Sequence, residues 1–142
     1  MGVGGRNFHS RVAIEIVSHL RVLLECSMEG FVVLPMADRS PSADVVLLMV
    51  DRKPHDESSR RRVLIALYQV NNWDKGNLDY AAELQQAGRL LAAILKKTPK
   101  VKNLDVTSAF VRVHDSPLPV DLDKCGFDYV LHMTPEMAQR AE

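Results

Sequence analysis

Two uninterrupted apolar runs constrain this chain more than any other feature of its sequence. They are Val-Val-Leu-Leu-Met-Val at residues 45–50 and Val-Leu-Ile-Ala-Leu at residues 63–67. Each run has the length of a β-strand and is far shorter than the ~20 apolar residues of a membrane-spanning helix. A strand with one face in water alternates apolar and polar residues, and neither run does. We therefore expect two strands that are covered on both faces.

The polar segment between the two runs predicts that they form a long hairpin. Residues 52–61 are too polar to pack in a core, and the apolar pattern then resumes as far as Val70. We expect a charged tip that contacts another subunit or partner, although ordinary solvated surface explains the same charges. The candidate contact residues are Asp56, Glu57, Arg60, Arg61 and Arg62.

Apolar spacing predicts two principal helices. In the first, over residues 8–26, apolar residues recur at steps of three and four: Val12, Ile16, Leu20 and Leu23. The second begins near residues 74–78 and ends near Lys97, because Lys96 and Lys97 favour a helix C-terminus and Pro99 prevents easy continuation.

Three further strands are expected around the hairpin. They lie at residues 31–34, at residues 105–113, and in a last segment whose Phe127, Tyr129, Leu131 and Met133 form one face. The resulting order is α-β-β-β-α-β-β. It indicates an α+β fold with a mainly antiparallel sheet, a long central hairpin and two principal helices.

Two helices would ordinarily lie together on one face of such a sheet. Other copies of the same protein would then cover the second face, since an uncovered apolar sheet forms a larger patch than a soluble monomer normally exposes. Two alternatives remain open. The helices lie on opposite faces, or the first strand and the loop at residues 115–125 fold over the sheet.

Length and charge favour a single domain with protein partners. The 142 residues include 18 Lys+Arg and 18 Asp+Glu, and this balance argues against dominant nucleic-acid binding. We expect a flexible arm at residues 1–7, one domain at 8–134 and a tail at 135–142. The sequence indicates no membrane segment, and Cys26 and Cys125 are expected to be reduced thiols.

The strongest enzyme-like signal is Asp51-Arg52-Lys53, which resembles the PD-(D/E)xK nuclease motif. That chemistry needs a second carboxylate to share a divalent ion, and Asp44 or Asp38 would supply it. Asp44 and Asp51 are seven positions apart, so on one strand they point to opposite faces. Since the histidines and cysteines also lack metal-ligand spacing, we expect no catalytic, metal or cofactor-binding residues and keep a nuclease as an alternative.

The second half of the chain separates its charges. Lys96, Lys97, Lys100 and Lys102 form a basic segment, whereas residues 115–142 carry six acidic residues against Lys124 and Arg140. Complementary patches of this kind could steer a head-to-tail contact between copies, and ordinary solvated surface is the alternative. The candidate contacts in the 115–125 loop are Asp121, Asp123 and Lys124.

The element order, the charged hairpin, the turn at Asn71-Asn72-Trp73 and the closing segment Gly126-Phe127-Asp128-Tyr129-Val130 together resemble a known family. Over residues 8–134 the chain is similar to tail terminator and tail completion proteins of long-tailed bacteriophages. This resemblance implies a non-enzymatic virion protein that forms a ring, typically a hexamer, on the last ring of the tail tube. Its implied partners are other copies, the tail tube protein and the head connector or adaptor. Another neck component, such as a connector adaptor or head completion protein, and a cellular scaffold remain alternatives.

Overall fold

The computed structural model describes residues 3–36, 43–56, 58–70, 80–99, 103–113, 123–134 and 136–137, with side chains from His9 onward. These residues form two helices and a five-stranded sheet, which confirms the predicted α+β class and element order. In chain order the elements are α1 (Val3–Glu25), β1 (Gly30–Pro35), β2 (Val45–Val50), β3 (Arg61–Val70), α2 (Tyr80–Lys97), β4 (Leu104–Val113) and β5 (Tyr129–Met133).

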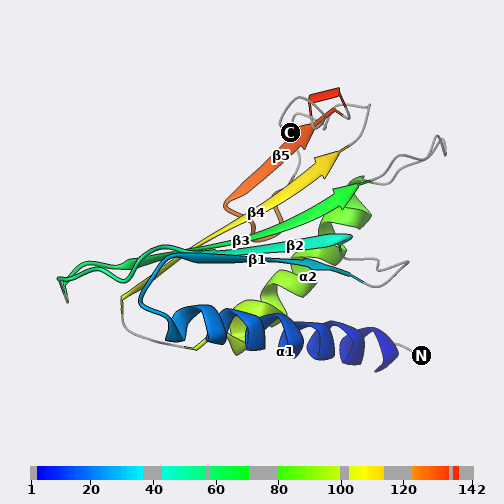
Figure 1. Ribbon diagram of the computed structural model, residues 1–142. Coiled ribbons are helices and arrows are strands. Elements are labelled where there is room, and N and C mark those ends of the chain that lie inside the picture. The colour runs from blue at the N-terminus through cyan, green and yellow to red at the C-terminus, as the bar shows by residue number, and fades with distance from the viewer. Residues whose placement is uncertain are drawn as a thin grey trace.

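The sheet is mixed rather than mainly antiparallel, with the strands in sequence order from β1 to β5 (Figure 1). The pairs β1–β2 and β2–β3 are antiparallel, as the hairpin prediction requires. The pairs β3–β4 and β4–β5 are parallel. The cause of the first parallel pair is α2, because a helical crossover returns the chain to the end of the sheet where β3 began.

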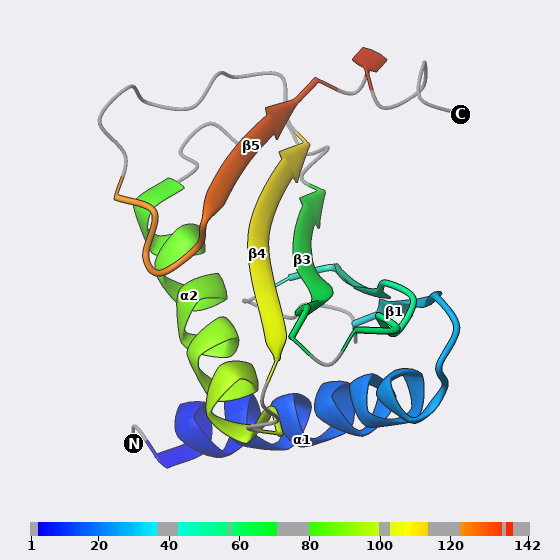
Figure 2. The same cartoon turned by 90° about the vertical axis from the view of Figure 1, so that its left-hand side faces the viewer.

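Both helices lie on the same face of the sheet (Figures 1 and 2). Residues from α1, α2 and the helix-facing side of the strands form one core. Its fully buried members include Ala13, Leu20, Val46, Leu48, Ile65, Leu67, Ala87, Leu90 and Ile94. The alternative in which the helices cover opposite faces is therefore wrong, and the opposite face carries no helix among the described residues.

Helix α1 is longer than the sequence predicts. It begins at Val3, so most of the segment predicted as a flexible arm is helical. The glycines at positions 4 and 5 lower helix propensity and gave no periodic signal. The predicted stripe is confirmed: Ile16 and Leu20 are buried in the core and Val12 and Leu23 are half-buried against it. Ala13 and Val17 are buried as well and were not part of the predicted stripe.

Arg61 holds the C-terminal end of α1 against the sheet. Its Nη atoms donate hydrogen bonds to the carbonyl oxygens of Leu24 at 2.9 Å, Cys26 at 2.6 Å and Met28 at 3.1 Å, and its Nε donates to that of Asp51 at 2.8 Å. Carbonyl groups at the end of a helix lack partners within the helix. Arg61 supplies donors to this chain end and is only 6% exposed.

The last strand differs from its predicted side-chain pattern. Phe127 precedes β5 and is buried, with its ring centroid 5.6 Å from that of Phe110 in the core. Tyr129 and Leu131 lie on the helix-free face and are exposed. The four predicted residues therefore do not share one face, because β5 begins only at Tyr129 and Phe127 belongs to the turn before it.

Candidate assembly surface

The helix-free side of the sheet, which we call the open sheet face, is apolar across all five strands. Strand pairing aligns residues of neighbouring strands in rows whose side chains share a face. One row is Val33, Leu47, Ala66, Ala109 and Tyr129. The row beside it is Pro35, Val45, Tyr68, Val111 and Leu131, and on the other side lie Phe31, Met49, Leu64 and Thr107.

The open sheet face is most exposed along its outer strands. Its exposed apolar side chains are Phe31 (68%), Tyr129 (57%), Val33 (52%), Leu131 (49%) and Met49 (44%). Residues on the central strands, such as Ala66 and Ala109, are buried. Single exposed apolar residues are normal on a protein surface, whereas a contiguous apolar patch marks an interaction site.

The two apolar runs differ in how they are covered. On β2, Val46, Leu48 and Val50 are buried by the helices, whereas Met49 on the other side is exposed. The prediction that both faces of β2 are covered is therefore not met within one chain. The central strand β3 is buried on both sides at Ile65, Ala66 and Leu67.

A hollow of about 900 Å³ lies at one end of the open sheet face. Its apolar part comes from Phe31, Met49 and Leu64, and its polar rim includes Asp51 and Arg62. Asp51 Oδ2 accepts a hydrogen bond from Arg62 Nη2 at 2.8 Å, and the Arg62 side chain is 78% exposed. This bond, followed by one from the Arg52 backbone N–H, lowers the pKa of Asp51 below its usual range. The hollow thus offers an apolar floor beside an exposed ion pair.

The structure divides the residues predicted as hairpin-tip contacts. Asp56 and Arg60 are exposed at the tip, and Glu57 lies outside the described residues. Asp56 Oδ1 accepts a hydrogen bond from the Ser58 backbone N–H at 2.9 Å, which lowers the pKa of Asp56. The prediction that Arg61 is a tip contact is wrong, because Arg61 is buried and its side chain stabilises the end of α1. Arg62 belongs to the rim of the open sheet face.

The second group of predicted contacts is only partly described. Asp121 lies outside the described residues, whereas Asp123 and Lys124 are exposed. Asp123 Oδ1 accepts a hydrogen bond from the Cys125 backbone N–H at 3.0 Å, and the Lys124 carbonyl accepts one from Phe127 N–H. Both residues therefore form the turn before β5, and their contact with a partner stays a prediction.

The geometry does not bring the proposed nuclease carboxylates together. Asp44 lies before β2 and accepts a hydrogen bond from the Val70 backbone N–H, whereas Asp51 follows β2 and pairs with Arg62. Asp38 is outside the described residues. Within the described part of the chain, no group of three or more His, Cys, Asp or Glu residues is placed to hold a metal ion.

A buried polar cluster that the sequence did not reveal closes one end of the core. Arg112 on β4 is fully buried, and its guanidinium carbon lies 3.4 Å from the ring centroid of Tyr80 at the start of α2. Its Nε donates to Glu83 Oε2 at 2.8 Å. The apolar neighbours of Arg112 in the sequence gave no signal, because Phe-Val-Arg-Val is also typical of a half-exposed strand.

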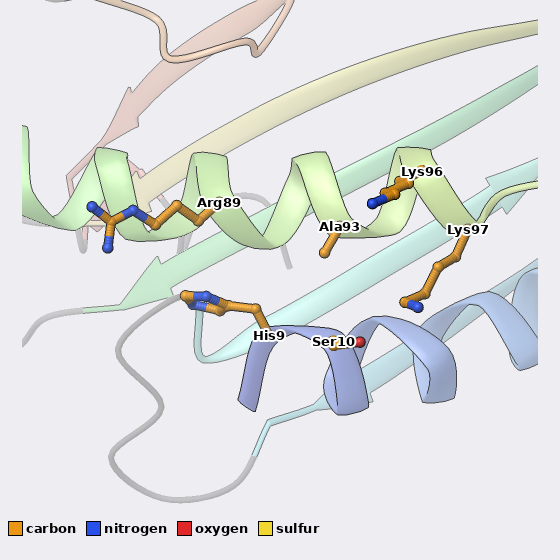
Figure 3. Close-up of a pocket in the computed structure, with 6 residues that line it drawn as sticks. All are labelled: His9, Ser10, Arg89, Ala93, Lys96 and Lys97. Atoms are coloured by element: carbon orange, nitrogen blue, oxygen red, sulfur yellow. The ribbon is translucent and has the colours of Figure 1, made fainter. Parts of the chain in front are cut away.

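A second hollow lies between the helices, as Figure 3 shows. Its volume is about 440 Å³, and it is lined by His9 and Ser10 of α1 and by Arg89, Ala93, Lys96 and Lys97 of α2. Burial, followed by the charge of Arg89, lowers the pKa of His9. The two lysines stand out in the sequence as part of a basic segment, whereas only the packing of α1 on α2 places His9 and Arg89 beside them.

The described helices include none with the length and apolarity to cross a membrane. Comparison of the chain with protein-family models, curated proteins and solved structures gives no match.

Proposed function

We propose that this protein is a structural subunit of a long-tailed bacteriophage virion. In this proposal copies form a ring, with six as the expected number, that caps the tail tube, ends its growth and forms the joint to the head connector. The observation that carries the proposal is the open sheet face, which no described helix covers and on which apolar side chains of β1, β2 and β5 are exposed on either side of a buried centre. The element order that resembles tail terminators supports it.

The free energy available from covering this face favours association. Burying one large apolar side chain contributes roughly 1.5–3 kcal/mol. Phe31, Met49 and Leu131 are each between 44% and 68% exposed in the single chain, so a neighbour that covers them would bury much of that apolar area. A cost of lost translational and rotational freedom opposes this gain, and assembly is therefore expected to depend on concentration.

The first experiment measures mass in solution by light scattering after size exclusion over a range of concentrations. We expect the mass to rise toward a closed ring. Phe31→Glu places a charge on the open sheet face and should weaken association strongly. Val22→Glu is the matched control, because Val22 is 62% exposed on α1, away from this face. A strict monomer at all concentrations, or equal weakening by both variants, would contradict the proposal.

A second measurement separates a tail terminator from another neck component. Isolated tail tubes and DNA-filled heads are incubated with the protein and sedimented. A terminator binds the tubes as a ring, whereas a connector adaptor or head completion protein binds the heads. Phe31→Glu serves as the assembly-deficient control in both arms.

A further inference from the structure

The sheet ends in two edge strands, β1 and β5, which lie at its opposite ends (Figure 1). Strand β1 pairs with β2, and strand β5 pairs with β4. None of the described segments pairs as a strand with the outer side of either one. Neither Gly30–Pro35 nor Tyr129–Met133 contains Lys, Arg, Asp or Glu. Charged residues commonly protect an edge strand from pairing, so both of these edges can accept a further strand.

The backbone of β1 directs Phe31 and Val33 away from β2. Directly after β2, Asp51 N–H donates to the Arg62 carbonyl oxygen at 2.9 Å, in register with the β2–β3 ladder. Backbone groups alternate in direction along a strand, so the even-numbered residues of β2 bond to the even-numbered residues of β1. The N–H and C=O groups of Phe31 and Val33 therefore face the outer edge. Pro35 shares this orientation, as the missing N–H of a proline permits.

The apolar exposure of the open sheet face is greatest on these same edge strands. Phe31 and Val33 on β1 are exposed, as are Tyr129 and Leu131 on β5, whereas Ala66 in the centre is buried. Exposure is thus concentrated where a strand lacks a neighbour on one side. A contact that joins β1 of one copy to β5 of the next supplies both missing neighbours. Pairing of β1 with a second β1 would leave Tyr129 and Leu131 exposed.

The directions of the strands allow this contact. Strand β1 is antiparallel to β2, and β2 is antiparallel to β3, so β1 and β3 run in the same direction. Strands β4 and β5 are parallel to β3. When copies are related by rotation about an axis along the strands, β5 of one copy and β1 of the next therefore meet in parallel.

We propose that β1 of one copy pairs in parallel with β5 of the neighbouring copy and that this contact joins the sheets around the ring. The inference rests on the proposed function, for which it names the contact between subunits. Two different edges meet, so the interface is heterologous and closes into a ring when the rotation between copies permits. Phe31 and Val33 then lie beside Tyr129 and Leu131 of the neighbouring copy on one continuous open sheet face.

Cross-linking between two differently labelled chains tests the pairing directly. In a Cys26→Ser/Cys125→Ser background, full chains with Val33→Cys are mixed with full chains that carry Leu131→Cys. A short bismaleimide reagent can join the two thiols, because paired strands lie about 4.8 Å apart. We expect a covalent dimer in the mixture and little in either variant alone.

The control mixes Val22→Cys, on the exposed side of α1, with Leu131→Cys and should give little dimer. Absence of a dimer from the Val33 and Leu131 mixture would overturn the pairing. Efficient dimer formation by Val33→Cys alone or by Leu131→Cys alone would also overturn it, because like edges would then meet.

A backbone substitution separates this contact from other routes to a ring. Val33→Pro removes the outward N–H of β1, whereas the matched control Val33→Ala shortens the side chain and keeps that N–H. Association measured by light scattering should be at least about tenfold weaker for Val33→Pro than for Val33→Ala. Circular dichroism verifies folding, and the cross-linking result decides the contact if Val33→Pro does not fold.

The two proposals fail in different ways. Rings of folded Val33→Pro that cap tail tubes as the wild type does would overturn the edge contact and leave the proposed function intact. Cross-linking of β1 to β5 in a protein that ignores tail tubes would support the edge contact while the proposed function fails.

Discussion

Gly88 on α2 lies directly against the backbone of Cys125, so that a Cβ added at Gly88 would be 2.6 Å from the Cys125 carbonyl oxygen and 3.0 Å from its Cβ. Cys125 is held at a positive φ of 50° in the turn before β5. The turn therefore approaches the helix as closely as a glycine allows.

Gly88→Ala should therefore destabilise the protein. Relief of the glycine penalty within a helix contributes about 1 kcal/mol of stability, but displacement of a backbone turn costs about 1–3 kcal/mol. We expect a net loss of up to about 2 kcal/mol in urea denaturation. Ala92→Ser on the exposed side of α2 is the control and should change stability by less than about 0.5 kcal/mol. A more stable Gly88→Ala variant would show that the turn can move away.

Arg61 and Arg62 are neighbours in the sequence with opposite roles. Arg61→Met removes the donors to three carbonyl oxygens at the end of α1 and to that of Asp51 after β2, and should cost about 2–4 kcal/mol of unfolding free energy. Arg62→Met removes only an exposed ion pair and should cost less than about 1 kcal/mol. Denaturant unfolding of both variants measures the difference. Equal losses would contradict the structural role of Arg61.

The Arg112–Glu83 pair should show strong coupling. Glu83→Ala leaves the buried guanidinium of Arg112 without its carboxylate and should cost about 3–5 kcal/mol. Arg112→Met combined with Glu83→Ala removes the uncompensated charge, so the double variant should be more stable than Glu83→Ala alone. A double-mutant cycle from denaturant unfolding measures this coupling. Additive losses would indicate that the pair contributes no specific interaction.

The protonation of Asp51, at the rim of the open sheet face, makes stability depend on pH. Because Arg62 and the Arg52 N–H hold its folded pKa below the ordinary value, its contribution to stability is complete above about pH 4 and is lost as pH falls through the folded pKa. Arg62→Gln should raise the pKa of Asp51 in an NMR titration. Asp56 is the internal control, because its lowered pKa depends on Ser58 and should not change.

The protonation of His9 changes with pH in the hollow between α1 and α2. Burial and then Arg89 place its folded pKa below the ordinary value, so the unfolded chain takes up the proton first and stability falls as pH drops below about 6.5. Arg89→Gln should raise the pKa of His9 but leave it below that of an exposed histidine, since burial persists. NMR titration of the imidazole measures this, and Arg52→Gln is the control. An unchanged pKa would contradict the placement of Arg89 beside His9.

Local patterns predicted the elements of this fold well. The buried stripe of α1 through Ile16 and Leu20, the two strands of the hairpin and the end of α2 at Lys97 all follow from side-chain periodicity and Pro99. The predicted start of α1 at residue 8 was wrong, because the glycines before it carry no periodic signal. The prediction that Phe127 shares a face with Tyr129 was wrong, because β5 begins only at Tyr129 and strand alternation does not extend back to Phe127.

The candidate surfaces were less predictable than the elements. Arg60, Arg61 and Arg62 read as one charged run, yet only tertiary packing determines that Arg61 is buried while its neighbours remain exposed. The uncovered face itself was anticipated from the apolar runs. Its extent was not, because the contributions of Phe31, Val33 and Leu131 depend on which strands become neighbours.

The sequence by itself determined which segments become helix or strand and that the hairpin is apolar on both sides, because these properties depend on residues close along the chain. Only the tertiary structure decided that both helices cover the same face, that β4 and β5 pair in parallel, and that His9 meets Arg89 across two helices. Those outcomes depend on contacts between residues that are distant in the sequence. Such residues bury or repel one another only after the helices have packed on the sheet.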